Sequence, residues 1–191
     1  LTAFGAEITV DALRVSVVGR PKLHGQEIVV PGDFSSAAFL LAAGLLSPSS
    51  QVTVRNVLLN PTRTGLLDVL RDMGARVEIV DARTEGGEPV GDLLVRPQKT
   101  VGVEVGGSII PRMIDEFPIL ALVATQAQGI TRVRDAAELR VKETDRIATT
   151  VDALRAMGAH IEGRPDGFDV QGPTPLQAAF VDSHGDHRLA M

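Results

Sequence analysis

LRDMGARVEIV, residues 70–80, and LRAMGAHIEG, residues 154–163, are two copies of one pattern. In each copy a helical apolar pattern ends at a glycine, Gly74 or Gly158, and the residues that follow alternate between apolar and polar. A glycine at this place is typical of a helix that ends in a left-handed residue and turns into a strand. The same order occurs around Gly5. The sequence therefore predicts three copies of a helix, a glycine and a strand hairpin.

A further helix and strand precede each of the last two copies. They are SSAAFLLAAGLL with QVTVRNVLL, and DEFPILALVATQAQG with ITRVRD. The predicted fold class is therefore α+β (α/β in the wider sense), built from repeated βαβαββ modules with helices on one sheet face. SSAAFLLAAGLL and FPILALVATQAQ are apolar nearly all round, which predicts buried inner helices. TGLLDVLRDMG and DRIATTVDALRAMG carry one apolar stripe each, which predicts helices that face solvent on one side.

A boundary between lobes is expected at VVPGDFSS, residues 29–36. Pro31 and Gly32 would interrupt a strand there, and Ser35 or Ser36 could cap the helix that follows. Residues before this point would belong to a different lobe. The chain has no initial Met and stops at GDHRLAM without helix-ending residues, so we expect both ends to be cuts within a longer protein.

The composition excludes several classes of protein. The 191 residues are 44% hydrophobic, enough for one or two cores, and the net charge of −5 offers no general attraction to nucleic acid or an anionic membrane. Cysteine is absent and the four histidines lack a metal-ligand spacing, so we expect no disulfide, no thiol catalysis and no metal. Because no apolar run is long enough to span a membrane and no signal peptide is recognisable, we expect a cytoplasmic protein.

The most unusual charges lie in AELRVKETDRIATTV, residues 137–151. A helix is expected to begin near Glu143 or Thr144, which places Lys142 and Arg146 at its N-terminal end. Cations are unfavourable at that end of the helix dipole and repel each other four residues apart, so an anion between them would reconcile the arrangement. The alternative is a solvated row of ion pairs, in which Lys142 pairs with Glu138 or Glu143 and Arg146 with Glu143.

Two further clusters have similar ambiguity. In IPRMIDEFPIL, Asp115 and Glu116 precede a helix that should be buried; they are either simple N-terminal caps or a carboxylate that can accept a proton from a substrate hydroxyl. In DSHGDHRLAM, Asp186, His187 and Arg188 follow a glycine at the start of a small-residue helix, where loop ion pairs are the alternative to a binding site.

Taken together, PGDFSSAAFLLAAGLL, VKETDR and GDHRLAM, in this order, resemble the 5-enolpyruvylshikimate-3-phosphate synthase (3-phosphoshikimate 1-carboxyvinyltransferase) family of enolpyruvyl transferases over essentially the whole chain. The resemblance implies a two-lobed fold with three βαβαββ units in each lobe, present here as a fragment. Residues 1–31 would be the C-terminal tail of the first lobe and residues 32–191 a partial second lobe. The units of that second lobe would be about 32–105 and 106–172, followed by a truncated third.

The resemblance also implies the reaction. It is transfer of the enolpyruvyl group of phosphoenolpyruvate to the 5-hydroxyl of shikimate 3-phosphate with release of phosphate, in the shikimate pathway to chorismate and the aromatic amino acids. No metal or organic cofactor is implied. The partners would be these small-molecule substrates and neither nucleic acid nor a membrane, and we expect a monomer.

By the same resemblance, Arg146 and Arg188 would bind phosphoenolpyruvate, and Lys142 would bind shikimate 3-phosphate. Asp115 would contact shikimate 3-phosphate and take the proton of the attacking 5-hydroxyl, and Glu143 would transfer the proton at the methylene carbon. Arginine suits such anions because its planar fork matches carboxylate and phosphate. Some members of the family have Asn in place of Glu138, to which we assign no site role. Since the ligands of the other lobe are absent, we expect the fragment alone to be inactive.

Two other interpretations stay open. The first is enolpyruvyl transfer to UDP-N-acetylglucosamine, which uses the same modules; VKETDR and the absence of the cysteine that most of those enzymes carry argue against it. The second is a non-catalytic repeat domain, in which Lys142, Asp115 and Arg188 could each be replaced without effect on any ligand.

Overall fold

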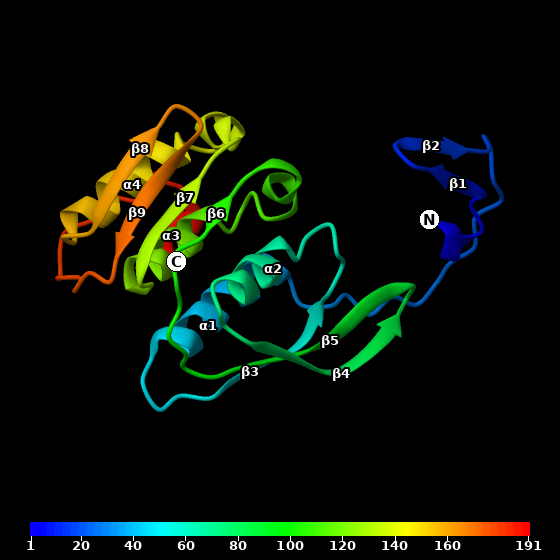
Figure 1. Ribbon diagram of the computed structural model, residues 1–191. Coiled ribbons are helices and arrows are strands. Elements are labelled where there is room, and N and C mark those ends of the chain that lie inside the picture. The colour runs from blue at the N-terminus through cyan, green and yellow to red at the C-terminus, as the bar shows by residue number, and fades with distance from the viewer.

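The computed structural model describes residues 1–191 and places two units of similar plan next to each other, with a separate hairpin ahead of them (Figure 1). The first unit consists of α1 (Phe34–Leu46), β3 (Val52–Leu58), α2 (Gly65–Asp72), β4 (Val77–Glu85) and β5 (Glu88–Val95). The second consists of β6 (Glu104–Val105), α3 (Phe117–Gln126), β7 (Gly129–Val133), α4 (Arg146–Ala156), β8 (His160–Arg164) and β9 (Gly167–Gly172). The 3-10 turns η2 (Gly107–Arg112) and η3 (Ala137–Val141) lie within the second unit, and α5 (His187–Ala190) follows it.

The repeat predicted from the three glycines is confirmed. Gly74 and Gly158 follow α2 and α4, and Gly5 follows the 3-10 turn η1 (Thr2–Phe4). Their φ values of 95° (Gly5), 87° (Gly74) and 90° (Gly158) lie in the left-handed region. A strand hairpin follows each of them: β1 (Ile8–Asp11) with β2 (Arg14–Val17), β4 with β5, and β8 with β9.

The two sheets share one strand order. The first has the order β3-β5-β4 and the second β6-β7-β9-β8, so β7, β9 and β8 correspond to β3, β5 and β4. Only the second unit has the complete βαβαββ plan, because β6 pairs with β7 in parallel. In the first unit the leading strand is reduced to an isolated parallel bridge between Gly32 and Val57.

The predicted strand before Pro31 is therefore wrong. Residues 18–31 contain no helix or strand and are almost entirely exposed, and the bridge consists of two bonds, from Gly32 N to Asn56 O (2.6 Å) and from Leu58 N to Gly32 O (2.9 Å). The physical reason is that Pro31 has no backbone N–H with which to extend such a ladder. Whether residues 1–31 belong to another lobe stays a prediction.

The inner helices α1 and α3 cover the sheets and contact each other, and both contribute to one cluster of 34 buried hydrophobic residues. The prediction of a buried helix is confirmed for α3, of which most residues are buried. For α1 it holds only in part, because Leu40 and Ala43 are exposed. The outer helix α4 buries Ile147, Val151 and Leu154, as its apolar stripe predicted. No helix is long and apolar enough to cross a membrane.

Candidate active site

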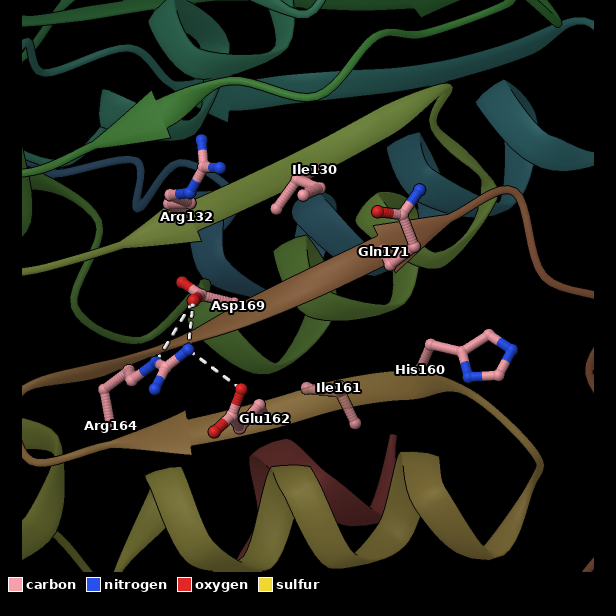
Figure 2. Close-up of a pocket in the computed structure, with 8 residues that line it drawn as sticks. All are labelled: Ile130, Arg132, His160, Ile161, Glu162, Arg164, Asp169 and Gln171. Carbon is pink, nitrogen blue, oxygen red and sulfur yellow. Dashed lines mark hydrogen bonds and ion pairs between the residues drawn. The ribbon is translucent and has the colours of Figure 1, made fainter.

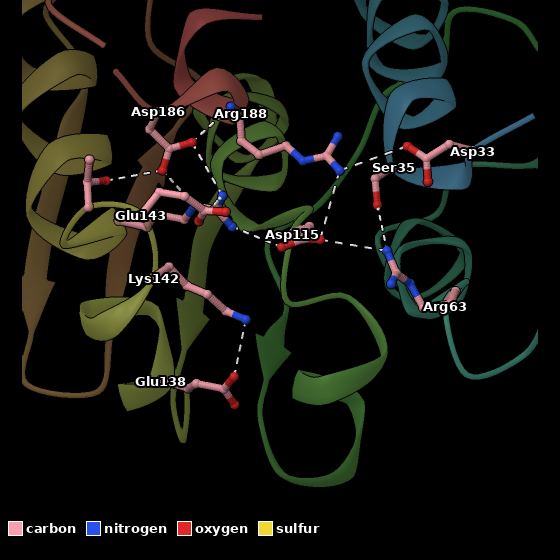
Figure 3. Close-up of polar contacts among 11 residues, drawn as sticks. Asp33, Ser35, Arg63, Asp115, Glu138, Lys142, Glu143, Asp186 and Arg188 are labelled. Atoms are coloured by element: carbon pink, nitrogen blue, oxygen red, sulfur yellow. Dashed lines mark hydrogen bonds and ion pairs between the residues drawn. The ribbon is translucent and has the colours of Figure 1, made fainter. Parts of the chain in front are cut away.

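The N-terminal ends of α1, α3, α4 and α5 gather charged and polar side chains from both units (Figure 3). We call this group the charged cluster. Its members are Asp33, Ser35, Arg63, Asp115, Glu143, Arg146, Asp186 and Arg188. Four of the five residues to which the sequence assigned a role lie within it, and the fifth, Lys142, lies next to Glu143.

Arg146 occupies the centre of the charged cluster. Helix α4 begins at Arg146 and not near Glu143 or Thr144 as predicted, because Asp145 is the N-cap and its Oδ1 accepts a hydrogen bond from Ala148 N (3.0 Å). An Asp at the N-cap satisfies a free amide of the first turn, which fixes the start of the helix at the following residue. The side chain of Arg146 is 1% exposed and points into the protein.

Three carboxylates surround the buried guanidinium. Arg146 Nε donates to Asp186 Oδ2 (2.8 Å), Nη1 to Asp115 Oδ1 (2.9 Å) and Nη2 to Glu143 Oε2 (2.7 Å). Burial lowers the pKa of Arg146, but the hydrogen bonds to Asp186 and Asp115 outweigh it and hold this pKa above its usual value. The guanidinium is therefore a permanent cation.

Lys142 pairs with Glu138 (3.2 Å), so each of the two cations has a carboxylate partner. The predicted repulsion between Lys142 and Arg146 is therefore wrong, since these partners neutralise both. The alternative of paired charges describes the contacts better, although it placed Arg146 in solvent and the structure buries it.

Asp115 connects the cations of the cluster. Its Oδ1 accepts from Arg146, whereas its Oδ2 lies 3.6 Å from Arg63 Nη2 and 3.9 Å from Arg188 Nη2. The side chain is 25% exposed, so the carboxylate can still be reached from outside. Simple capping does not describe this region: Glu116 holds the N-cap position of α3 without a side-chain capping bond.

Asp186 and Arg188 lie at the start of the C-terminal helix α5. Asp186 is fully buried, caps α5 and receives a hydrogen bond from Arg188 N (2.9 Å). Burial raises the pKa of Asp186, but the hydrogen bonds from Arg146 and Arg188 N outweigh burial and hold this pKa below its usual value. The Nε of Arg188 is buried and has no partner, which leaves a donor free for an anion.

Several members of the charged cluster received no role from the sequence. The sequence places Asp186 in the GDHR cluster without giving it a role, and no local pattern marks Arg63. Arg63 lies in NPTRTG, just before α2. Only its contact with Asp115 of the other unit places it in the charged cluster. The cap of α1 is Asp33, which accepts from Ser36 N (2.8 Å), and not Ser35 or Ser36 as predicted.

Apart from the charged cluster, a hollow lies on the face of the second sheet away from α3 and α4 (Figure 2). Its lining residues are Ile130, Arg132, His160, Ile161, Glu162, Arg164, Asp169 and Gln171. The central cation, Arg164, is neutralised by Glu162 and Asp169, both at 2.8 Å. These contacts are cross-strand and neighbouring ion pairs of a sheet face. The charged cluster instead joins residues of both units around a buried cation, so it is the candidate site. No three His, Cys, Asp or Glu side chains are grouped so that they could hold a metal.

The chain is similar to known proteins over its whole length. A family model described as EPSP synthase (3-phosphoshikimate 1-carboxyvinyltransferase) matches residues 1–191. The 3-phosphoshikimate 1-carboxyvinyltransferase of Geobacillus kaustophilus is 56% identical over 98% of this chain, and that of Bacillus subtilis is 54% identical over 100%. The structure of EPSP synthase from Acinetobacter baumannii superposes on the whole chain with a TM-score of 0.95 at 37% identity. The chain spans 44% of the length of the Geobacillus protein and of the Acinetobacter structure, and 45% of the Bacillus protein.

Proposed function

Because this chain belongs to the EPSP synthase family, we propose that the full-length protein transfers the enolpyruvyl group of phosphoenolpyruvate to the 5-hydroxyl of shikimate 3-phosphate. In the addition step the 5-oxygen bonds to C2 of phosphoenolpyruvate while a proton joins C3, which becomes a methyl group. In the elimination step the bond from C2 to the phosphate oxygen breaks, C3 gives up a proton and phosphate leaves. Such a sequence needs an acid and a base that exchange roles.

The two carboxylates of the proposed acid–base pair are Asp115 and Glu143. Asp115 takes the proton of the attacking 5-hydroxyl, and its partial exposure supports this role. Glu143 donates the proton to C3 and later removes it. Its side chain is half exposed and held at one oxygen by Arg146, which leaves the other oxygen available for proton transfer.

The cations bind the substrate anions. Arg188 contributes a buried donor without a partner, the strongest sign in the cluster that an anion belongs there. Arg146 contacts phosphoenolpyruvate with the one N–H, on Nη1, that its carboxylate partners leave over. Lys142 exchanges Glu138 for shikimate 3-phosphate. Fixed cations around a developing charge also stabilise the tetrahedral intermediate.

The observation that carries the proposal is the convergence of Asp115 and Glu143 on the buried Arg146. The test is release of phosphate from phosphoenolpyruvate by the full-length protein with and without shikimate 3-phosphate. Asp115→Asn should lower kcat by about 10²- to 10⁴-fold, the range of general acid–base catalysis. Asp72→Asn, an exposed residue at the end of α2, serves as the control. Release that does not need shikimate 3-phosphate, or that occurs with a UDP-sugar instead, would contradict the proposal.

The proposed enzyme is a cytoplasmic monomer in which residues 1–31 belong to the first lobe and residues 32–191 to the second. The exposed apolar side chains Val10 and Val15, which pair across β1 and β2, support the first assignment because the rest of the first lobe would cover them. Val15→Asp should accordingly lower the Tm of the full-length protein.

A further inference from the structure

The first unit reaches the acid–base residues of the second through one side chain, Arg63. Its guanidinium points from the first unit toward Asp115 of the second, with Nη2 3.6 Å from Asp115 Oδ2 (Figure 3). The same Nη2 donates to the hydroxyl of Ser35 (3.1 Å). Ser35 is buried in the first turn of α1, so the hydroxyl is a fixed acceptor.

The loop that carries Arg63 is held in place at several points. Asn60 organises it as a turn, since its side chain accepts from Thr62 N (3.0 Å) and its carbonyl accepts from Arg63 N (2.8 Å). From the second unit, Arg112 Nε donates to Pro61 O (2.7 Å). A backbone fixed in this way presents its side chain at little further cost in conformational entropy.

The surroundings of Asp115 require such a cation. Glu116, its neighbour, is 1% exposed and its Oε1 has no hydrogen-bond partner. Burial first, and then the charge of Asp115, raise the pKa of Glu116 against the opposing effects of Ser35, Arg63 and Arg188, and the net shift is upward. Two adjacent carboxyl groups thus depend on few cations, of which Arg63 is the one contributed by the first unit.

We propose that Arg63 is a positioning residue, which orients the carboxylate of Asp115 for proton transfer from the substrate hydroxyl. Arg146 holds Oδ1 at 2.9 Å, so a second contact on Oδ2 fixes the plane of the carboxylate. The longer contacts leave Oδ2 as the oxygen that accepts the proton, while the substrate oxygen bonds to carbon. This inference rests on the proposed function.

The test compares Arg63→Gln with Arg71→Gln in the full-length enzyme. Arg71 is exposed on α2 and pairs only with Asp68, so its replacement should leave the kinetics unchanged. Arg63→Gln should lower kcat by about 10- to 100-fold, because a displaced catalytic group is costly, and should change each KM by less than about twofold. Arg63→Lys, which keeps the charge without the fork, should recover part of kcat.

A purely structural role would give a different result. The Arg63 side chain is half exposed, so its ion pair adds little to stability and the Tm of Arg63→Gln should match that of wild type. Three results for Arg63→Gln would each overturn the positioning role: unchanged kinetics, a Tm well below that of wild type, or a raised KM with normal kcat. If instead the wild type fails to release phosphate in response to shikimate 3-phosphate, the proposed function itself is refuted.

Discussion

The two units begin their second helices in different ways. In the first, α2 has 8 residues and Arg63 lies in the loop before it, with a side chain 49% exposed. In the second, α4 has 11 residues and Arg146 is its first residue, with a side chain 1% exposed. Both guanidinium groups nevertheless contact Asp115, one at each oxygen. Two copies of one repeated unit can thus place two cations against one carboxylate. The burial of each arginine determines how much it contributes to the free energy of unfolding.

The largest difference should appear when each arginine is replaced by leucine. Arg146→Leu leaves Asp186 fully buried without its cation, which should cost about 3–5 kcal/mol in the free energy of unfolding. Arg63→Leu should cost about 1 kcal/mol or less. Urea denaturation of the full-length variants measures both values, and equal costs would show that burial does not separate the two arginines.

Replacing the glycine after the second helix of each unit by alanine should have a smaller effect on stability, and it tests whether the two units are equivalent. Gly74 and Gly158 have nearly the same φ, and an added Cβ would meet nothing within 4 Å at Gly74 and only Pro175 O, at 4.0 Å, at Gly158. Alanine at either position should therefore cost only the backbone strain of the left-handed conformation, about 1–2 kcal/mol. Costs that differ by more than about 0.5 kcal/mol in thermal unfolding would break the equivalence of the units.

The smallest effects should concern pH, and their signs differ between Asp186 and Glu116. The pKa of Asp186 is lowered in the fold, so its contribution to stability is present above the unfolded value of 3.8 and is lost as pH falls through the folded pKa. The pKa of Glu116 is raised, so its contribution is present below 4.5 and is lost as pH rises through the folded pKa. Glu116→Gln should therefore be more stable than wild type at neutral pH.

Asp186→Asn serves as the opposite case, less stable than wild type at neutral pH. Both differences should shrink in acid. For Glu116→Gln this should happen as pH falls from the raised folded pKa toward about 4.5, with no further change below that pH, whereas for Asp186→Asn it should begin only below about pH 3.8; urea unfolding across pH measures both. A Gln variant that is less stable than wild type at pH 7 would contradict the upward shift.

Local patterns in the sequence were enough for the repeat, and they singled out some of the residues that meet in the charged cluster. A glycine after a helix has few alternatives to a left-handed turn, which is why Gly5, Gly74 and Gly158 located the hairpins. The burial of α3 followed from its composition, since a helix that is apolar on all sides has no face for solvent. Likewise, the charges of VKETDR and GDHR marked Arg146 and Arg188 as unusual before any contact was known.

The remaining features depend on contacts that local patterns do not contain. Asp33, Ser35 and Ser36 are nearly equal as caps, and only the geometry of the chain entering α1 selects Asp33. The same holds for α4, where the hydrogen bond from Ala148 N to Asp145 Oδ1 fixes the start of the helix. Arg63 of the first unit pairs with Asp115 of the second, a contact that the spacing of charges along the chain does not predict.

The two units share a single hydrophobic core, which determines how the protein unfolds. Its 34 residues run from Phe34 in α1 to Val170 in β9 without a division between the units. In a solenoid, each repeat contacts only its neighbours and can open alone. Here the opening of either unit would expose the apolar surface of the other, so amide protons in the central strands β5 and β9 should exchange through one shared opening event. The two repeated units should therefore unfold together as one cooperative unit. A substitution that destabilises either unit should disrupt the whole charged cluster.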